Sequence, residues 1–222
     1  MGINGLLLFL KSVFSKSHIS NYRGLKIGID GYCWLHKAIY TNNLNIIENP
    51  KSVSFAHFIK RKLKKLIING IVPILIFDGN KLPIKTVEEF QRNHRRQKLR
   101  TEAEDLIKQG KFNEGRAKLA QAIDITPQMV HSLLDVIKNI GIEHIIAPYE
   151  ADAQLAYLDK INYIDVVCTE DSDLIAYGCR RIIYKLDKHG NCFEIKNCDI
   201  FKMPEFKSFT QSQFLEFCVL SG

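Results

Sequence analysis

The chain has 222 residues and a formal net charge of +7, with 46% hydrophobic and 25% charged residues, a composition typical of a soluble globular protein. No apolar run reaches the roughly 20 residues of a membrane span, and the first residues lack the basic and small-residue features of a signal peptide. The six cysteines form no Cys-x-x-Cys pair, which argues against a zinc site or a disulfide framework and favours reduced thiols.

Strand-like and helical patterns alternate along the chain, which predicts an α/β fold. In chain order, we predict a helix at 5–14, a strand at 25–30, a helix at 32–40, a polar loop at 42–52, a helix at 55–68, a strand at 71–77, two helices within 81–122, a helix at 127–139, strands at 142–147 and 164–168, a hairpin at 181–195 and a helix at 214–220. Thr126 as N-cap and Pro127 as the first helical residue mark the start of the helix at 127–139.

The predicted helix at 55–68 carries a basic run on an amphipathic pattern. Its apolar residues, Phe55, Ile59, Leu63, Leu66 and Ile67, fall at helical spacing, and residues 60–65 read Lys-Arg-Lys-Leu-Lys-Lys. The run could be a nuclear-localisation signal. Its position on the helix favours a surface that is solvated or faces a DNA backbone.

The segment 81–122 is highly charged and too long for an ordinary connection. Pro83 opens it and Gly110 interrupts it, so we expect two helices standing off the sheet. Residues 81–100 carry seven Lys or Arg against two Glu. Such a concentration of positive charge suits nucleic acid better than a small anion.

Acidic residues follow the predicted strands. Glu150 and Asp152 come after the strand at 142–147, and Asp171 and Asp173 come after the strand at 164–168. Both strands are expected to be buried. Neighbouring parallel strands bring the segments after them together at one edge of the sheet. A single pair is better explained by the preference of carboxylates for the first turn of a helix, but two pairs in consecutive turns reverse this and favour a shared crevice.

Two further strand-like runs end in Asp30 and Asp78, which brings the acidic set to six carboxylates. At close range they would repel one another and raise their own pKa values unless a cation neutralised them. Oxygen ligands favour Mg²⁺ or Mn²⁺. Because one Mg²⁺ uses only one or two carboxylates, two ions are the simpler account, and two ions suit hydrolysis of a phosphodiester.

These features occur within motifs of a known family. The shared motifs are Met1-Gly2-Ile3 with Gly5-Leu6-Leu7, Asp30 with Tyr32-Cys33-Trp34-Leu35-His36-Lys37, Pro73 with Phe77-Asp78-Gly79, residues 147–158 around Tyr149-Glu150-Ala151-Asp152-Ala153-Gln154, and Thr169-Glu170-Asp171-Ser172-Asp173-Leu174. On these motifs the whole chain resembles the flap endonuclease and XPG-type superfamily of 5′ nucleases. The motifs at 32–36 and 149–154 make it more similar to the exonuclease branch than to flap endonuclease proper.

The resemblance implies a PIN-like, Rossmann-like sandwich with a mostly parallel central sheet, helices on both faces and a helical arch insertion. It implies an N-terminal region at about 1–100, the arch at about 81–125 and an internal region at about 135–222. In the family, a Ser-Gly such as that at 221–222 precedes a further aspartate-bearing motif and a helix-two-turn-helix. We expect both to be missing from these 222 residues.

The resemblance also implies roles for individual residues. The metal ligands for two Mg²⁺ ions, with Mn²⁺ as a substitute, would be Asp30, Asp78, Glu150, Asp152, Asp171 and Asp173. Lys85 and Arg92 match the basic pair that reaches the scissile phosphate, and the residues that would bind nucleic acid are Gly2, Tyr32, His36, Arg95 and Arg96. Lys85 and Arg92 are seven residues apart, two helical turns, and so share a face, although any one cation in this segment, taken alone, is better explained by a solvated helix face.

The function implied is a metal-dependent 5′-to-3′ DNA exonuclease and 5′-flap endonuclease that acts in DNA repair or recombination in the nucleus. Its partner would be DNA with 5′ ends or 5′ flaps, with no membrane and with protein partners unknown. The alternative is a truncated, non-catalytic DNA-binding module of the same fold. A weaker alternative is a related nuclease of RNA.

Overall fold

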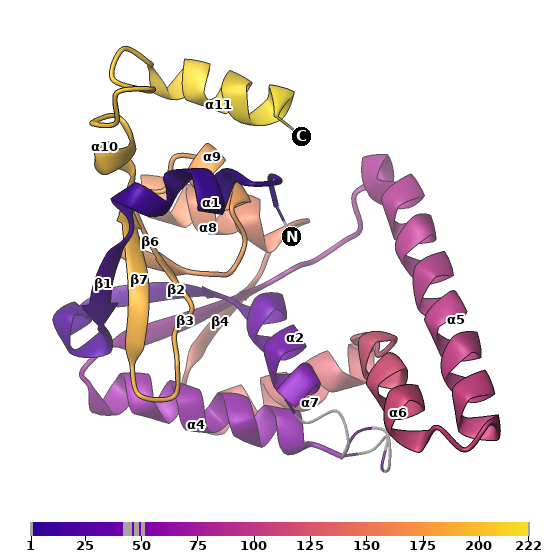
Figure 1. Cartoon of the computed structure of the whole chain (residues 1–222). Coiled ribbons are helices and arrows are strands. Elements are labelled where there is room, and N and C mark those ends of the chain that lie inside the picture. The colour runs from indigo at the N-terminus through magenta and orange to yellow at the C-terminus, as the bar shows by residue number, and fades with distance from the viewer. Residues whose placement is uncertain (1, 42–45, 47–48, 50–51, 222) are drawn as a thin grey trace. The chain divides into compact units, whose positions relative to one another are not determined.

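The computed structural model describes residues 2–41, 46, 49 and 52–221 (Figure 1). Its elements are α1 (Leu6–Phe9), η1 (Leu10–Val13), β1 (Ser15–His18), η2 (Ile19–Tyr22), β2 (Lys26–Asp30), α2 (Gly31–Thr41), α4 (Ser54–Ile68), β3 (Val72–Phe77), η3 (Pro83–Lys85), α5 (Thr86–Lys108), α6 (Phe112–Gln121), α7 (Pro127–Lys138), β4 (Glu143–Ile146), α8 (Ala151–Lys160), β5 (Val166–Cys168), α9 (Asp173–Ala176), β6 (Arg181–Tyr184), β7 (Asn191–Lys196), α10 (Asn197–Ile200) and α11 (Gln211–Leu220).

Most predicted elements are confirmed within one or two residues. The predicted loop at 42–52 lies mostly outside the described residues. None of the described helices is long and apolar enough to cross a membrane. The chain divides into two compact units, Met1–Cys33 with Lys62–Gly79 and Ile142–Gly222, and Trp34–Arg61 with Asn80–Gly141.

The first unit is built on a mostly parallel sheet of seven strands in the order β1-β7-β6-β5-β2-β3-β4. The pairs β2–β3, β2–β5, β3–β4 and β5–β6 are parallel. The predicted hairpin pairs β6 with β7 in antiparallel register, and β1 extends the sheet beyond β7. Because β2, β3 and β5 are neighbours and run in one direction, their carboxyl ends meet at one edge.

At the sheet edges one prediction was wrong and one strand was missed. We expected the strand at 142–147 to be buried, but β4 is the last strand of the sheet and is only partly covered. The sequence also gave no sign of β1, because Ser15-Lys16-Ser17-His18 has no apolar alternation. An edge strand with one neighbour can be polar, since it buries little side-chain surface.

Both faces of the central strands are covered. On one face, Ile74, Ile76 and Val167 belong to a core that also contains apolar side chains of α1, α8, α9 and α11. The alternate residues of the same strands, such as Ile29 and Leu75, are fully buried as well. Because both of their faces are buried, β2, β3 and β5 have continuous apolar sequences instead of alternating ones.

The second unit contains the charged segment as two helices, as predicted. Gly110, with a φ of 80°, allows the reversal between α5 and α6. The two helices pack closely, and Lys118 of α6 forms an ion pair with Glu102 of α5. Thr126 caps α7 by accepting a hydrogen bond from the Met129 amide.

The basic helix α4 is confirmed with one exception. Phe55, Ile59, Leu63 and Leu66 are buried, whereas Ile67, which the spacing placed on the same apolar face, is 44% exposed. Ile67 lies in the last turn of α4, at the margin of the apolar face. A residue at this position is buried only if another element happens to cover it.

Asp159 and Arg180 form the most extensive ion pair of the first unit. The Asp159 carboxylate is 3% exposed and accepts hydrogen bonds from the backbone amide and the guanidinium of Arg180. The same guanidinium donates to the backbone carbonyl of Ile164 at 3.0 Å. This network joins α8, the segment before β5 and the segment before β6.

We expect Arg180→Ala to lower the free energy of unfolding by about 3 kcal/mol, because it leaves the Asp159 carboxylate buried without its charged partner. Chemical denaturation followed by circular dichroism measures this. The matched control is Lys108→Ala, which breaks the exposed pair of Lys108 with Asp105 and should have a much smaller effect. Equal losses for the two variants would show that the Asp159 pair is no more important than a surface pair.

Candidate metal and nucleic-acid site

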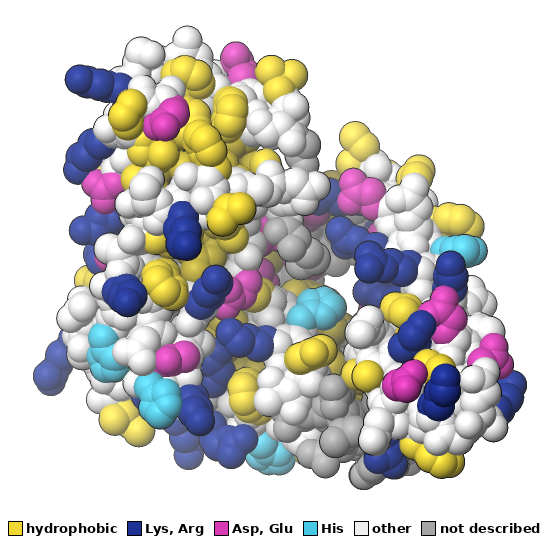
Figure 2. All heavy atoms as spheres, viewed as in Figure 1, with side chains coloured by type: hydrophobic (Ala, Val, Ile, Leu, Met, Phe, Trp, Pro, Cys, Tyr) yellow, Lys and Arg dark blue, Asp and Glu magenta, His cyan; other side chains and the backbone are white. Residues whose placement is uncertain are grey.

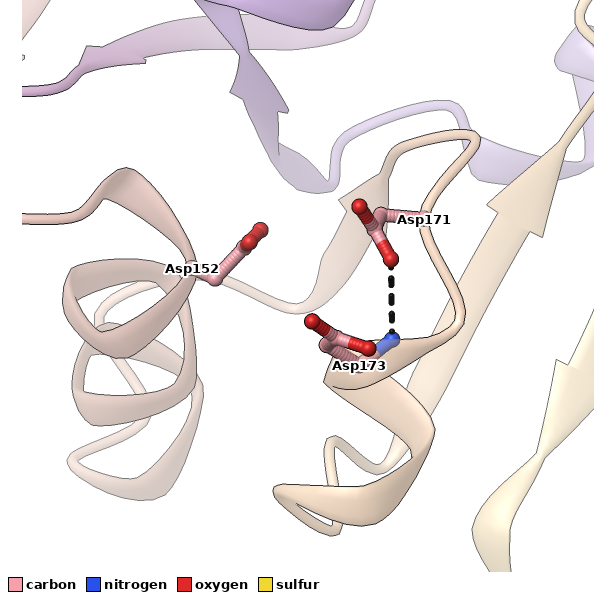
Figure 3. A group of neighbouring side chains, drawn as sticks. All are labelled: Asp152, Asp171 and Asp173. Carbon is pink, nitrogen blue, oxygen red and sulfur yellow. Dashed lines mark hydrogen bonds between the residues drawn. The ribbon is translucent and has the colours of Figure 1, made fainter. Parts of the chain in front are cut away.

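Three aspartates converge at the carboxyl edge of the sheet. Asp152 lies in the first turn of α8, Asp173 is the first residue of α9, and Asp171 lies in the turn between β5 and α9. One ligand oxygen from each lies within 4.8 Å of the others. Figure 3 shows their carboxylates pointing toward one another, with the Asp173 amide donating to Asp171 Oδ1 at 3.2 Å.

Asp30 is the last residue of β2 and Asp78 directly follows β3, at the same edge of the sheet. Asp30 is 7% exposed and accepts hydrogen bonds from the Cys33 amide at 2.9 Å and the Thr169 hydroxyl at 3.3 Å. Asp78 Oδ1 accepts from the Ala151 amide at 2.7 Å, which joins the end of β3 to the start of α8. These bonds fix each carboxylate at the end of its strand.

The carboxylates interact electrostatically. Burial, followed by the charges of Asp30, Asp171, Asp173 and Asp78, raises the pKa of Asp152 to about 8. Burial raises the pKa of Asp30 to about 6, and the Asp78 and Asp171 charges add to the shift, while bonds from Cys33 and Thr169 oppose it. Burial is the main cause of both shifts and the neighbouring carboxylate charges add to it, so a cation bound at this edge would lower both pKa values.

A divalent cation fits this donor set. Oδ1 of Asp152 is buried and has no hydrogen-bond partner among the described residues, and a buried oxygen of this kind needs a partner. The neighbouring ligand oxygens of Asp171 and Asp173 are carboxylate oxygens, the ligands preferred by Mg²⁺ and Mn²⁺. Glu150, the N-cap residue of α8, is not among the three residues whose ligand oxygens lie within 4.8 Å of one another, so its role as a ligand stays a prediction.

The raised pKa values predict how stability depends on pH. A carboxyl group whose pKa is higher in the folded state stabilises the fold while it is protonated, and this stability is lost as the pH rises through the folded-state pKa. In EDTA, the melting temperature should therefore fall between pH 5 and pH 8, by about 5 °C. Mg²⁺ or Mn²⁺ at pH 8 should restore it.

Asp152→Asn should flatten this pH profile, because it removes the group whose pKa lies near 8. Asp199→Asn is the matched control, since Asp199 pairs with Lys202 on the surface of α10. The measurement is thermal unfolding at a series of pH values with and without metal. An unchanged slope in Asp152→Asn would mean that this carboxylate does not control the profile.

Two hydroxyl residues of the site were missed by the sequence interpretation, although both lie within a quoted motif. Thr169 is 1% exposed, and its hydroxyl bonds Asp30 while accepting from the Asp171 amide at 3.0 Å. The Ser172 hydroxyl accepts from the Ile3 amide at 2.8 Å and so ties the N-terminal segment to the acidic turn. The sequence signal that could have identified Thr169 and Ser172 is their position close to the paired aspartates of the acidic turn.

Gly2 and Tyr32 lie beside the acidic cluster. Gly2 has a φ of 88°, and a Cβ at this position would clash with Asp171 Oδ1 and the Ser172 hydroxyl, so only glycine fits against the acidic turn. Tyr32, in the first turn of α2, is partly exposed and meets Phe77 edge-on with ring centroids 6.1 Å apart. Their roles toward nucleic acid stay predictions.

The predicted basic residues belong to the second unit. Figure 2 shows Lys and Arg side chains gathered over α5 and α6, with Asp and Glu side chains between them. Lys85 is the last residue of η3 and is partly exposed, whereas Arg92 and Arg95 on α5 are exposed. Arg92 lies 3.8 Å from Glu88 one turn earlier, a distance at which an exposed pair contributes little.

His36 and Arg96, both in this unit, interact electrostatically. His36 is exposed, yet desolvation by its neighbours, followed by the charge of Arg96, lowers its pKa. Asp124 opposes this shift, and Arg92 adds to it. A lowered pKa favours the neutral ring, which can stack on a nucleobase without losing a charged hydration shell.

Two family models match the chain at the regions that carry these residues. The XPG N-terminal domain matches residues 1–99 and the XPG I-region matches residues 141–222. The first region contains Asp30 and Asp78, and the second contains the acidic turns. The chain belongs to the XPG family.

Named relatives of this XPG-family chain are nucleases. Exonuclease 1 of Danio rerio is 38% identical over 223 residues, which cover 100% of this chain and 28% of the relative. Exodeoxyribonuclease 1 of Schizosaccharomyces pombe is 38% identical over 200 residues, 90% of this chain and 35% of the relative. The chain thus spans about a third of the length of these relatives.

Solved structures share the fold. The catalytic core of Rad2 in complex with DNA substrate has a TM-score of 0.75 at 22% identity, covering 100% of this chain and 62% of that one. GEN1 in complex with product DNA and a Mg²⁺ ion has a TM-score of 0.59 at 18% identity, covering 91% of this chain and 42% of that one. The mostly parallel sheet with its helices is therefore the fold of these nucleases, which confirms the predicted α/β class.

Proposed function

We propose that the chain is the nuclease core of a metal-dependent 5′-to-3′ DNA exonuclease and 5′-flap endonuclease. The observation that carries the proposal is the convergence of Asp152, Asp171 and Asp173, with a buried Asp152 oxygen that lacks a described partner. Exonuclease 1 relatives that align over the whole chain support the reaction class. A structural relative that holds DNA and Mg²⁺ supports the ligand and the ion.

Each predicted residue has a role in this proposal. Asp30, Asp78, Asp152, Asp171 and Asp173, with Glu150, would hold two Mg²⁺ ions, for which Mn²⁺ could substitute. The bound cations would supply Lewis-acid stabilisation of the phosphate charge and a more acidic water. Lys85 and Arg92 would stabilise charge that develops on the scissile phosphate.

The remaining residues would bind and orient the DNA. Tyr32 and the neutral His36 would pack against the bases at the 5′ end, because stacking tolerates any sequence. Arg95 and Arg96 would contact backbone phosphates, and Gly2 would keep the N-terminal segment against Asp171. The division into an N-terminal region, an arch and an internal region belongs to the same proposal, as does a place of action in the nucleus, supported by relatives from eukaryotes.

The test is single-turnover cleavage of a labelled 5′-flap DNA in Mg²⁺, with binding measured on the same substrate in EDTA. Cleavage that needs the metal and begins from the 5′ side supports the proposal. Binding without any cleavage would instead favour the second candidate, a non-catalytic DNA-binding module. An RNA flap of the same sequence, cleaved faster than the DNA flap, would favour an RNA nuclease.

A further inference from the structure

An ion pair in the second unit holds one of the predicted DNA-binding arginines. Arg96 of α5 places Nη1 3.0 Å from Oδ2 of Asp124, which lies between α6 and α7. The other carboxylate oxygen of Asp124 accepts a hydrogen bond from the Ile125 amide at 2.9 Å. One oxygen of the carboxylate is thus hydrogen-bonded to the backbone, and the other forms the ion pair with Arg96.

The same nitrogen of Arg96 also makes a hydrogen bond. Nη1 donates to Oδ1 of Asn93 at 3.2 Å, so the described hydrogen bond and the described ion-pair contact of this guanidinium both lie at Nη1. No partner for its Nε–Nη2 edge is found in the part of the chain that the structure describes. Two adjacent N–H groups of this kind match two oxygens of a phosphate, the geometry in which arginine binds most strongly.

Asp124 has positively charged groups of the same unit as electrostatic neighbours. Its charge acts on His36 together with those of Arg96 and Arg92. The Arg96 side chain is 27% exposed and that of Asp124 is 43% exposed, so a polyanion can reach both. A carboxylate at this position repels phosphate, so it lowers the affinity for DNA unless it also has a favourable effect on binding.

We propose that Asp124 is a positioning residue that holds Arg96 with its Nε–Nη2 edge presented to a backbone phosphate of DNA. The inference rests on the proposed function, since Arg96 is assigned to DNA there. Charge alone predicts that removal of Asp124 tightens binding, whereas positioning predicts that removal weakens it. Whether removal of Asp124 tightens or weakens DNA binding therefore decides between the charge effect and the positioning effect.

The experiment measures affinity for a 5′-flap DNA in EDTA at several salt concentrations. Asp124→Ala should weaken binding about fivefold although it raises the net charge. Asp124→Asn should stay within about twofold of the native chain, because an amide oxygen can still accept from Arg96. The matched control is Asp105→Ala, which removes the carboxylate that lies 3.5 Å from Lys108 near the end of α5 and should not weaken binding.

A double variant separates positioning from a general structural effect. In an Arg96→Ala chain, adding Asp124→Ala should cause no further loss, because the two residues act through one contact. Native affinity or better in Asp124→Ala, or a further loss in the double variant, would overturn the inference. Absence of DNA binding by the native chain would overturn the proposed function as well, so the two failures are distinguishable.

Discussion

Asp173→Ala should abolish cleavage of a 5′ flap in Mg²⁺, with a loss of at least about a thousandfold in the single-turnover rate. Its ligand oxygen lies within 4.8 Å of those of Asp152 and Asp171, so its removal dismantles a shared cation site. A metal ion contributes several kcal/mol of charge stabilisation to a phosphoryl reaction, which corresponds to this loss in rate. Asp171→Ala should behave in the same way.

DNA binding should change much less than the rate. Binding is expected to depend mainly on the basic residues of the second unit, and the loss of one carboxylate reduces repulsion of the phosphate backbone. Asp199→Ala, at a surface pair on α10, serves as the control and should cleave normally. An Asp173→Ala chain that cuts at the native rate would show that the assigned site is wrong.

Arg92→Ala and Lys85→Ala should each lower the single-turnover rate by about a hundredfold and weaken DNA binding less than about fivefold. A cation that contacts the phosphate mainly in the transition state affects the rate more than the affinity. Arg92 is available for this contact, because its described partner, Glu88, lies 3.8 Å away in an exposed pair. Arg92→Lys should recover only part of the loss. Lysine restores the positive charge but not the planar guanidinium, which can bind two phosphate oxygens at once.

The neighbouring arginines give the contrast. Replacement of Arg95 should weaken binding at all sequences and make its salt dependence shallower, as expected for a contact with a backbone phosphate. Lys98→Ala, an exposed residue of α5, is the control and should change neither quantity strongly. If Lys85, Arg92, Arg95 and Lys98 variants all lost affinity equally, the segment would be a generic basic patch.

Local patterns in the sequence predicted the parts of the fold that depend on neighbours along the chain. The apolar runs of β2, β3 and β5 predicted strands, and the aspartates that follow them predicted an acidic edge. Helical spacing predicted α4, and Thr126 with Pro127 predicted the start of α7. Gly190 in the turn predicted the β6–β7 hairpin, which the antiparallel pairing confirms.

The tertiary structure decided what depends on neighbours in space. β1 is a strand only because β7 offers it an edge, and β4 is partly exposed because no strand follows it in the sheet. Spacing in the sequence could not select Asp152, Asp171 and Asp173 from six carboxylates, because strand order and the start of each helix set their distances. The pairing of Arg96 with Asp124, 28 residues away, likewise exists only where α5 and the segment before α7 meet.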